Sequence, residues 1–258
     1  GSDLNYYFSH MYNCIYDCKY CFLQGLYSSS NYVIFINYED FISEIKHLIK
    51  INKNKSITFF SGYDCDSLAM EKITGFGDFF LKNYIENDNI NYELRTKSLQ
   101  EKIFLNYQPT NNIVIAYSLL PESLSNRFDN KVPNLSKRIF LIKKLSSIGW
   151  NIGLRFDPLI YSHDWKFLYE NLIRNVLQNI DKRKLHSISL GALRFPKHFF
   201  HRITKMHPGE ELFFENFEKK NDIFTYKKDI EREMISYCEK LIYKKLGNDV
   251  KIFSCSPY

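Results

Sequence analysis

The sequence predicts an α/β fold, a partial (β/α)6 TIM-type barrel with a C-terminal hairpin and helix extension. Six short apolar segments alternate with segments of helical periodicity over residues 6–190. Such alternation implies a parallel sheet with right-handed crossovers. Polar and charged residues gather where each expected strand ends, and barrels of this class carry their chemistry there. A chain of 258 residues is long enough for one such domain.

Hydrophobic periodicity and turn residues predict the individual elements. Apolar residues three or four positions apart indicate helices, and short apolar runs before turn signals indicate strands. The expected strands cover residues 6–10, 56–60, 90–95, 112–119, 151–156 and 187–190. The expected helices cover residues 38–51, 70–85 with a break at its glycines, 99–105, 135–147 and 165–179. Residues 121–133 are expected to form a polar loop.

The pattern changes after Pro196. Residues 197–228 are basic, aromatic and less periodic, which favours a hairpin or a lid over the barrel mouth. Residues 229–246 form an amphipathic helical pattern, and residues 250–253 a last strand. We therefore expect a partial barrel over residues 1–196, with a cysteine loop at 14–21. Residues 197–258 are expected to pack on it within the same structural unit.

The charge balance is mildly basic. The chain has 35 Lys and Arg against 29 Asp and Glu, a net charge of +6, which permits a nucleic-acid partner without requiring one. No run of about 18 apolar residues indicates a membrane span, and no signal peptide is recognisable. Six cysteines, three of them clustered, fit metal ligation in a reducing compartment better than a disulfide framework. We therefore expect a cytoplasmic protein.

The most specific motif is formed by Cys14, Cys18 and Cys21. Their spacing leaves no histidine near enough for a four-ligand zinc knot, and structural zinc normally takes four ligands. Three close thiolates suit a 4Fe–4S cluster whose fourth iron stays open. An open iron can chelate S-adenosylmethionine (SAM). The alternative is a zinc ribbon that borrows a fourth ligand from Cys65, Cys255 or His10.

This cysteine loop resembles that of the radical SAM superfamily. Four later segments narrow the resemblance to the spore photoproduct lyase-like group, also labelled DNA repair photolyase-like. They are residues 21–24 (Cys-Phe-Leu-Gln), 93–98 (Glu-Leu-Arg-Thr-Lys-Ser), 153–158 (Gly-Leu-Arg-Phe-Asp-Pro) and 190–196 (Leu-Gly-Ala-Leu-Arg-Phe-Pro). The resemblance covers nearly the whole chain in order and implies a barrel of radical SAM type.

The resemblance also implies roles for individual residues. Lys97 matches a lysine that contacts the SAM carboxylate, and Ser118 a serine near the same SAM. Cys65 and Asp66 fall where the family has Ser-Asp near the SAM amino group. Tyr20 matches a tyrosine of the radical relay.

Two positions depart from the family. Tyr63 stands where spore photoproduct lyases have a hydrogen-donating cysteine, and Phe22 where they have a tyrosine. Cys65 is close enough in sequence to act as the donor instead. For Arg155 the sequence leaves two readings open, a phosphate or SAM contact and a salt bridge at the barrel mouth.

We expect a radical SAM enzyme that uses a 4Fe–4S cluster and SAM to abstract hydrogen from a DNA lesion or modified nucleobase. Arg194, His198 and Arg202 are the expected substrate contacts, and flavodoxin or ferredoxin the expected reductant. One alternative is radical chemistry on a peptide or small metabolite. Another is a non-enzymatic zinc or iron–sulfur module that binds nucleic acid.

Overall fold

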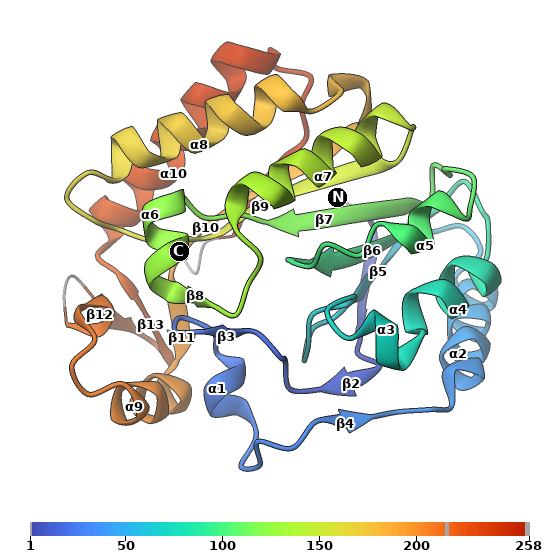
Figure 1. The fold of residues 1–258 in the computed structure, drawn as a ribbon, viewed down its shortest axis with the longest axis horizontal. Coiled ribbons are helices and arrows are strands. Elements are labelled where there is room, and N and C mark those ends of the chain that lie inside the picture. The colour runs from blue at the N-terminus through green and yellow to red at the C-terminus, as the bar shows by residue number, and fades with distance from the viewer. Residues whose placement is uncertain (1, 215–216, 256–258) are drawn as a thin grey trace.

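The computed structural model describes residues 2–214 and 217–255. Its centre is a parallel sheet of seven strands in the order β1-β5-β6-β7-β9-β10-β14 (Figure 1). These strands are β1 (Leu4–Phe8), β5 (Ile57–Ser61), β6 (Ile90–Thr96), β7 (Ile113–Ser118), β9 (Asn151–Leu159), β10 (Leu185–Ala192) and β14 (Ile252–Ser254). The sheet curls into the predicted open half-barrel, and β14 adds a seventh strand to the six expected before residue 196.

Helices cover the convex face of this sheet. Figure 1 shows α7, α8 and α10 along one side and α2 and α4 at the opposite end. The longer helices are α2 (Tyr38–Ile51), α4 (Phe76–Asn83), α7 (Leu135–Ser147), α8 (Trp165–Asn179) and α10 (Lys228–Leu246). Short helices α1 (Leu23–Leu26), α3 (Glu71–Thr74) and α5 (Lys102–Leu105) lie in the connections. The strand residues that face the helices, such as Ile115 and Leu154, are fully buried.

Several charged side chains share the concave face of the sheet, since every second residue of a strand points to the same face. On β6, Glu93 and Arg95 lie on this face, and Lys97 follows the strand end with the same parity. On β9, Arg155 and Asp157 share it. Strands buried on both faces are normally apolar throughout. The charged residues therefore mark the concave face as the place of a site.

Two segments differ from the sequence prediction. The expected loop at residues 121–133 contains helix α6 (Glu122–Phe128) and strand β8 (Asp129–Asn130), because Leu124 and Phe128, four positions apart, bury one helical face. Residues 197–228 begin with helix α9 (Lys197–Met206), in which Phe199 and Ile203 are buried in the same way. The predicted break in residues 70–85 is confirmed at Gly75, which adopts a φ of +60°.

The hairpin expected in the C-terminal extension is formed by β12 (Phe217–Lys220) and β13 (Ile223–Tyr226). It pairs with β11 (Arg194–Pro196) in a three-stranded antiparallel sheet. Two-stranded pairs β2 (Met11–Tyr12) with β4 (Val33–Ile34), and β3 (Asp17–Cys18) with β8, shape the cysteine loop. Single 3-10 turns cover Lys182–Lys184 and Glu211–Phe213. Among the described residues, no helix is both long and apolar enough to cross a membrane.

Candidate active site

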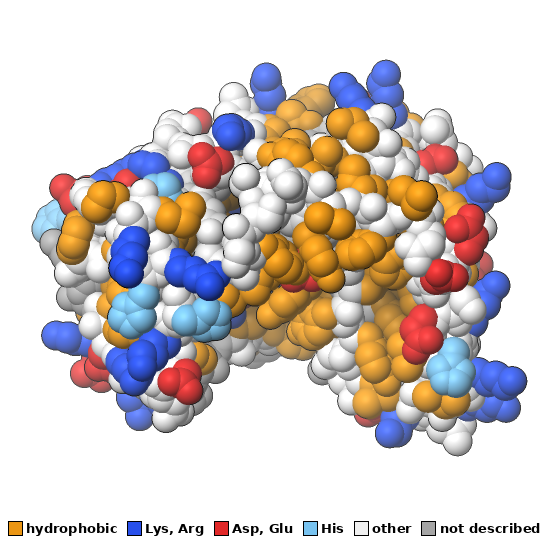
Figure 2. All heavy atoms as spheres, turned by 90° about the horizontal axis from the view of Figure 1, so that it is seen from below, with side chains coloured by type: hydrophobic (Ala, Val, Ile, Leu, Met, Phe, Trp, Pro, Cys, Tyr) orange, Lys and Arg blue, Asp and Glu red, His pale blue; other side chains and the backbone are white. Residues whose placement is uncertain are grey.

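A cavity of about 510 Å³ opens on the concave side of the sheet. The cysteine loop, the carboxyl ends of the strands and the α9 segment line it. Residues from all three parts and from β14 meet there: Cys14, Cys18, Tyr20, Cys21, Phe22, Tyr63, Cys65, Asp66, Arg95, Lys97, Ser118, Asp157, Arg194, Phe199 and Cys255. Seen from below, the molecule is hollowed between two lobes, and hydrophobic side chains cover much of the hollow (Figure 2). The three predicted cluster cysteines thus share one cavity with most of the predicted cofactor residues and with Arg194, but not with Arg155, His198 or Arg202.

The three motif cysteines all face this cavity and none forms a disulfide. Pairing of β3 with β8 holds Cys18, whose carbonyl accepts a hydrogen bond from the N–H of Cys21 at 3.0 Å. Within residues 2–214 and 217–255, no three His, Cys, Asp or Glu side chains are gathered closely enough to hold one metal ion. In an iron–sulfur cluster each thiolate binds a different iron. The donor set of three separate thiols on one cavity wall therefore fits a 4Fe–4S cluster.

The environment of these thiols favours a cationic group beside them. Burial raises the pKa of all three, well above the usual range for Cys14 and to about 12 for Cys18. At Cys18 the nearby Lys97 ammonium opposes this rise. Metal ligation requires thiolates. A buried thiol of raised pKa becomes a thiolate when positive charge, such as that of bound iron, compensates it.

Lys97 is the centre of a buried network below the cysteine loop. Its Nζ donates to Cys18 Sγ at 3.2 Å, to the Tyr20 hydroxyl at 2.5 Å and to Asp129 Oδ1 at 3.0 Å. The Tyr20 hydroxyl in turn donates to Asp129, and Arg138 pairs with the other oxygen of that carboxylate at 3.4 Å. Lys97 and Arg138 hold the pKa of Asp129 down at about 2 against the effect of burial. Tyr20 and Lys97 are thereby fixed at the cavity wall.

Asp66 and Cys65 follow the end of β5, as predicted. Asp66 accepts hydrogen bonds from the Thr96 hydroxyl at 2.6 Å and from the N–H of Lys97 at 2.6 Å. Its carboxylate therefore ties the end of β5 to the end of β6. The Cys65 thiol is buried, 4.0 Å from His10 Nδ1. Burial lowers the pKa of His10 to about 4, so this ring is neutral.

A series of aromatic rings forms one rim of the cavity. Tyr63 stacks edge-on against Tyr7 at 5.4 Å and lies 5.7 Å from Phe22, and Phe22 stacks on Phe199 at 6.1 Å. Tyr7 and Tyr63 are 61% and 54% exposed. Tyr63, which stands at the position of the family's hydrogen-donating cysteine, thus lines the cavity with a largely exposed side chain.

Arg155 does not line this cavity. Its guanidinium is buried and makes a bidentate ion pair with Glu93, with bonds of 2.6 and 3.1 Å. Of the two readings of Arg155, the geometry supports the salt bridge and not the SAM contact, because Glu93, Ser187 and two backbone carbonyls engage its N–H groups. Arg194 does line the cavity, paired with Asp157 at 3.0 Å.

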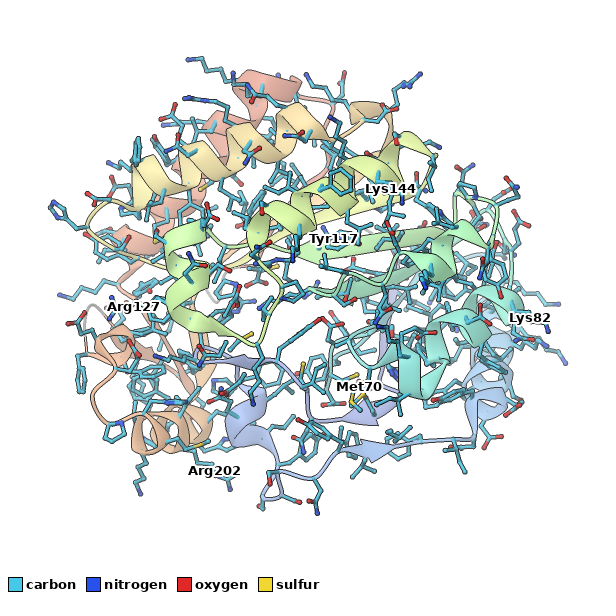
Figure 3. All side chains as sticks on the ribbon, in the orientation of Figure 1. Met70, Lys82, Tyr117, Arg127, Lys144 and Arg202 are labelled. Atoms are coloured by element: carbon cyan, nitrogen blue, oxygen red, sulfur yellow. The ribbon has the colours of Figure 1, made fainter. Side chains whose placement is uncertain are left out.

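Helix α9 and the residue that follows it contact α1, the short helix after the cysteine loop. Arg202 donates to the carbonyl of Gly25 in α1 at 2.8 Å (Figure 3). His207 Nε2 lies 2.7 Å from Gln24 Oε1, and Gln24 donates to the carbonyl of Cys18 at 2.9 Å. His198 is exposed on α9 and packs against Phe199, so the structure places neither His198 nor Arg202 on the cavity wall. Figure 2 shows basic and histidine side chains gathered on this lobe.

Comparison with known proteins decides the family. A family model described as spore photoproduct lyase matches residues 4–248. The chain belongs to the spore photoproduct lyase family. It is 22% identical over 209 residues to the spore photoproduct lyase of Clostridium acetobutylicum, covering 81% of this chain and 62% of the relative. It is 19% identical over 207 residues to that of Bacillus subtilis, covering 80% of this chain and 58% of the relative. The chain thus spans about 60% of the length of these relatives.

Solved structures of spore photoproduct lyase share the fold. One, a mutant with dinucleoside spore photoproduct, superposes with a TM-score of 0.85 at 16% identity and covers 95% of this chain and 75% of its own. A second, with bound SAM and dinucleoside spore photoproduct, has a TM-score of 0.82 at 16% identity, covering 97% and 75%. The predicted partial barrel and the family resemblance are confirmed.

Four residues in or next to the site were not predicted from the sequence. Asp129 and Arg138 support Lys97 and Tyr20, and Glu93 and Arg95 join Arg155. Asp129 lies in a segment expected to be loop, and nothing in the sequence links it to Lys97. A signal did exist for Glu93 and Arg95, because alternation of charged with apolar residues along one strand indicates a polar face.

Proposed function

We propose that this chain is a radical SAM enzyme that acts on a nucleic-acid lesion of the spore photoproduct kind. The observation that carries the proposal is the convergence of three free thiols and Lys97 on one cavity, in a chain of the spore photoproduct lyase family. A relative in this family binds both SAM and dinucleoside spore photoproduct.

Cys14, Cys18 and Cys21 would hold the cluster through their thiolates. When bound, a reduced 4Fe–4S cluster supplies the electron that cleaves SAM to methionine and a 5′-deoxyadenosyl radical. The Lys97 ammonium, held by Asp129 and Tyr20, would present its charge to a carboxylate of SAM. Ser118, at the end of β7, supplies a hydroxyl on the same wall.

The rest of the cavity would receive the substrate. Lesion bases inside a duplex are out of reach of a recessed site, so they must be extruded to react. Tyr63 and Cys65 lie in the wall with an O–H and an S–H, and either group can return a hydrogen atom to a product radical. Arg194, on β11, lines the same cavity. Reduction by flavodoxin or ferredoxin remains a prediction.

The test is anaerobic. Protein reconstituted with iron and sulfide is reduced with dithionite and given SAM, with and without dinucleoside spore photoproduct. We expect 5′-deoxyadenosine that disappears in Cys14→Ser, Cys18→Ser and Cys21→Ser, and conversion of the lesion to thymidine. Cys238→Ser is the matched control, since this buried thiol lies on α10 away from the cavity lining. About one zinc per chain and no 5′-deoxyadenosine would overturn the proposal. Turnover of SAM without repair would point to another substrate.

A further inference from the structure

Three arginines and two carboxylates form a network on the concave face of the sheet. Arg155 pairs bidentately with Glu93 at 2.6 and 3.1 Å, and its remaining N–H groups donate to backbone carbonyls and Ser187. Arg194 pairs bidentately with Asp157 at 3.0 and 3.2 Å. Each carboxylate in the network is thus already matched by one guanidinium.

Arg95 is the third guanidinium and lies on the cavity side of this network. Its Nε and Nη2 both donate to Glu93 Oε1, at 3.1 and 3.0 Å, and the same oxygen also accepts from Arg155. The Arg95 side chain is 41% exposed, whereas that of Glu93 is 6% exposed. In the part of the chain that the structure describes, Nη1 of Arg95 has no hydrogen-bond partner.

The positive charge of Arg95 is not fully balanced by the carboxylates around it. The carboxylates that act on it are Glu93 and Asp157, and each is shared with another arginine. Glu231 acts on Arg194, while it accepts a hydrogen bond from the Thr225 hydroxyl. The Cys255 thiol beside the network has its pKa raised by burial, so it contributes no charge at neutral pH. A guanidinium with free N–H groups on a cavity wall is suited to a bidentate oxyanion.

The aromatic rim of the cavity indicates which oxyanion Arg95 binds. Tyr7 and Tyr63 present largely exposed rings to the same cavity. Such rings stack on any nucleobase, and a nearby cation commonly follows the backbone of the same strand. From these contacts we infer that Arg95 binds a phosphodiester of a single or extruded strand whose base stacks on Tyr7 or Tyr63. This rests on the proposed function for its reaction, but the binding can be measured without turnover.

The test compares two ligands that differ by one charge. Thymidylyl-(3′→5′)-thymidine and its uncharged methylphosphonate analogue are titrated into the reconstituted protein by calorimetry. Because a hydrogen bond to a charged group contributes about 1.5–3 kcal/mol, the wild type should bind the charged dinucleotide about tenfold or more tightly. Arg95→Gln should bind both alike, and Arg95→Lys should keep much of the preference. Arg174→Gln, an arginine of similar exposure on α8, is the control and should match wild type.

Each contrary result has a distinct meaning. A wild type that binds both dinucleotides equally overturns the inference even if Arg95→Gln does not fold. Preference retained in Arg95→Gln also overturns it. If Arg95→Gln keeps the preference but binds SAM more weakly, the anion at Arg95 is the SAM carboxylate and the assignment is wrong. Loss of SAM cleavage in the wild type, with the dinucleotide preference intact, would instead remove the proposed function and leave the phosphodiester site.

Discussion

Among individual side chains, Lys97 links the stability of the fold to its site. The ammonium lies between the Asp129 carboxylate, the Tyr20 hydroxyl and the Cys18 thiol, all buried. The pKa of Lys97 is raised well above its usual value, because these neighbours outweigh the burial that would lower it. Lys97 is therefore charged at neutral pH.

Replacing Lys97 by methionine should destabilise the protein strongly. The change leaves Asp129 with Arg138 as its remaining cation, and breaking a buried ion pair from one side costs about 3–5 kcal/mol. Urea unfolding measures the loss. Lys166→Met, which breaks the exposed pair with Glu233, should leave the unfolding free energy almost unchanged, because exposed ion pairs contribute little. Equal effects of the two changes would show that Lys97 is not the centre of a buried network.

Glu93 should make stability fall in acid. Arg155 and Arg95 hold its pKa at about 2 in the folded protein, against the opposing effect of burial. A depressed folded pKa contributes stability that is present above the unfolded pKa, about 4.5, and is lost as pH falls toward 2. Urea unfolding at pH values from 6 downward, in steps of about one pH unit, should show this loss of unfolding free energy. A variant with Glu93→Gln and Arg155→Met should show a flatter profile; an unchanged profile would assign the acid sensitivity to other carboxylates.

Among the secondary-structure elements, α9 and the turn that follows it contact the cysteine loop and α1 through three polar contacts. Arg202 holds the carbonyl of Gly25, His207 holds Gln24, and Glu210 pairs with Lys19 at 2.7 Å. Glu210 also binds Arg127 of α6 at 3.2 Å. The loop that carries the cysteines is thereby closed by residues that lie far away in the sequence.

Removing these hydrogen bonds should increase local opening of the cysteine loop and α1. Arg202→Ala combined with His207→Ala should increase hydrogen exchange over residues 18–26 by about thirtyfold, since each of the two lost hydrogen bonds contributes about 1 kcal/mol to closure. Lys205→Ala, an exposed residue of α9, is the control and should leave exchange unchanged. Protection of residues 18–26 that survives the double change would show that packing of α1, and not these bonds, holds the loop.

Helix α4 packs closely against the end of α3 and against α5 at Gly77. A Cβ there would lie 2.7 Å from Leu68 Cδ2 and 2.9 Å from both Glu71 Oε2 and Ile103 Cδ1. Gly77→Ala should therefore cost about 1–3 kcal/mol of unfolding free energy, as overpacked core positions do. Gly209→Ala, where a Cβ meets nothing within 4 Å, is the control. A neutral Gly77→Ala would mean that α3 and α4 can move apart.

At the scale of the whole molecule, the C-terminal extension packs directly on the barrel. Strand β14 completes the sheet beside β10, and α10 buries Met234, Cys238 and Ile242 against it and α8. A fragment of residues 1–196 should therefore fail to fold cooperatively. Trp150 and Trp165 are buried in the full chain, so their emission should be that of an unfolded chain in the fragment. A sharp thermal transition in the fragment would show that residues 1–196 form an independent domain.

Much of this arrangement could be predicted from the sequence, for identifiable reasons. The six strands before residue 196 were predicted because they are apolar runs that end in turn residues, and the cysteine loop because ligand spacing is local. Helices α6 and α9 were missed because each has only one pair of buried apolar residues among charged neighbours. The partnership of Lys97 with Asp129 joins residues 32 positions apart, and charge pairs between elements leave no periodic trace in a sequence.

The ion pair between Lys19 and Glu210 joins residues 191 positions apart, which fixes an order of events during synthesis. At translation rates of about 5–20 residues per second, Glu210 emerges roughly 10–40 s after Lys19. Throughout that interval the three thiols have left the ribosome while the segment that closes over their loop does not yet exist. The nascent chain therefore exposes its three thiols for that whole interval before the contact that fixes their loop can form.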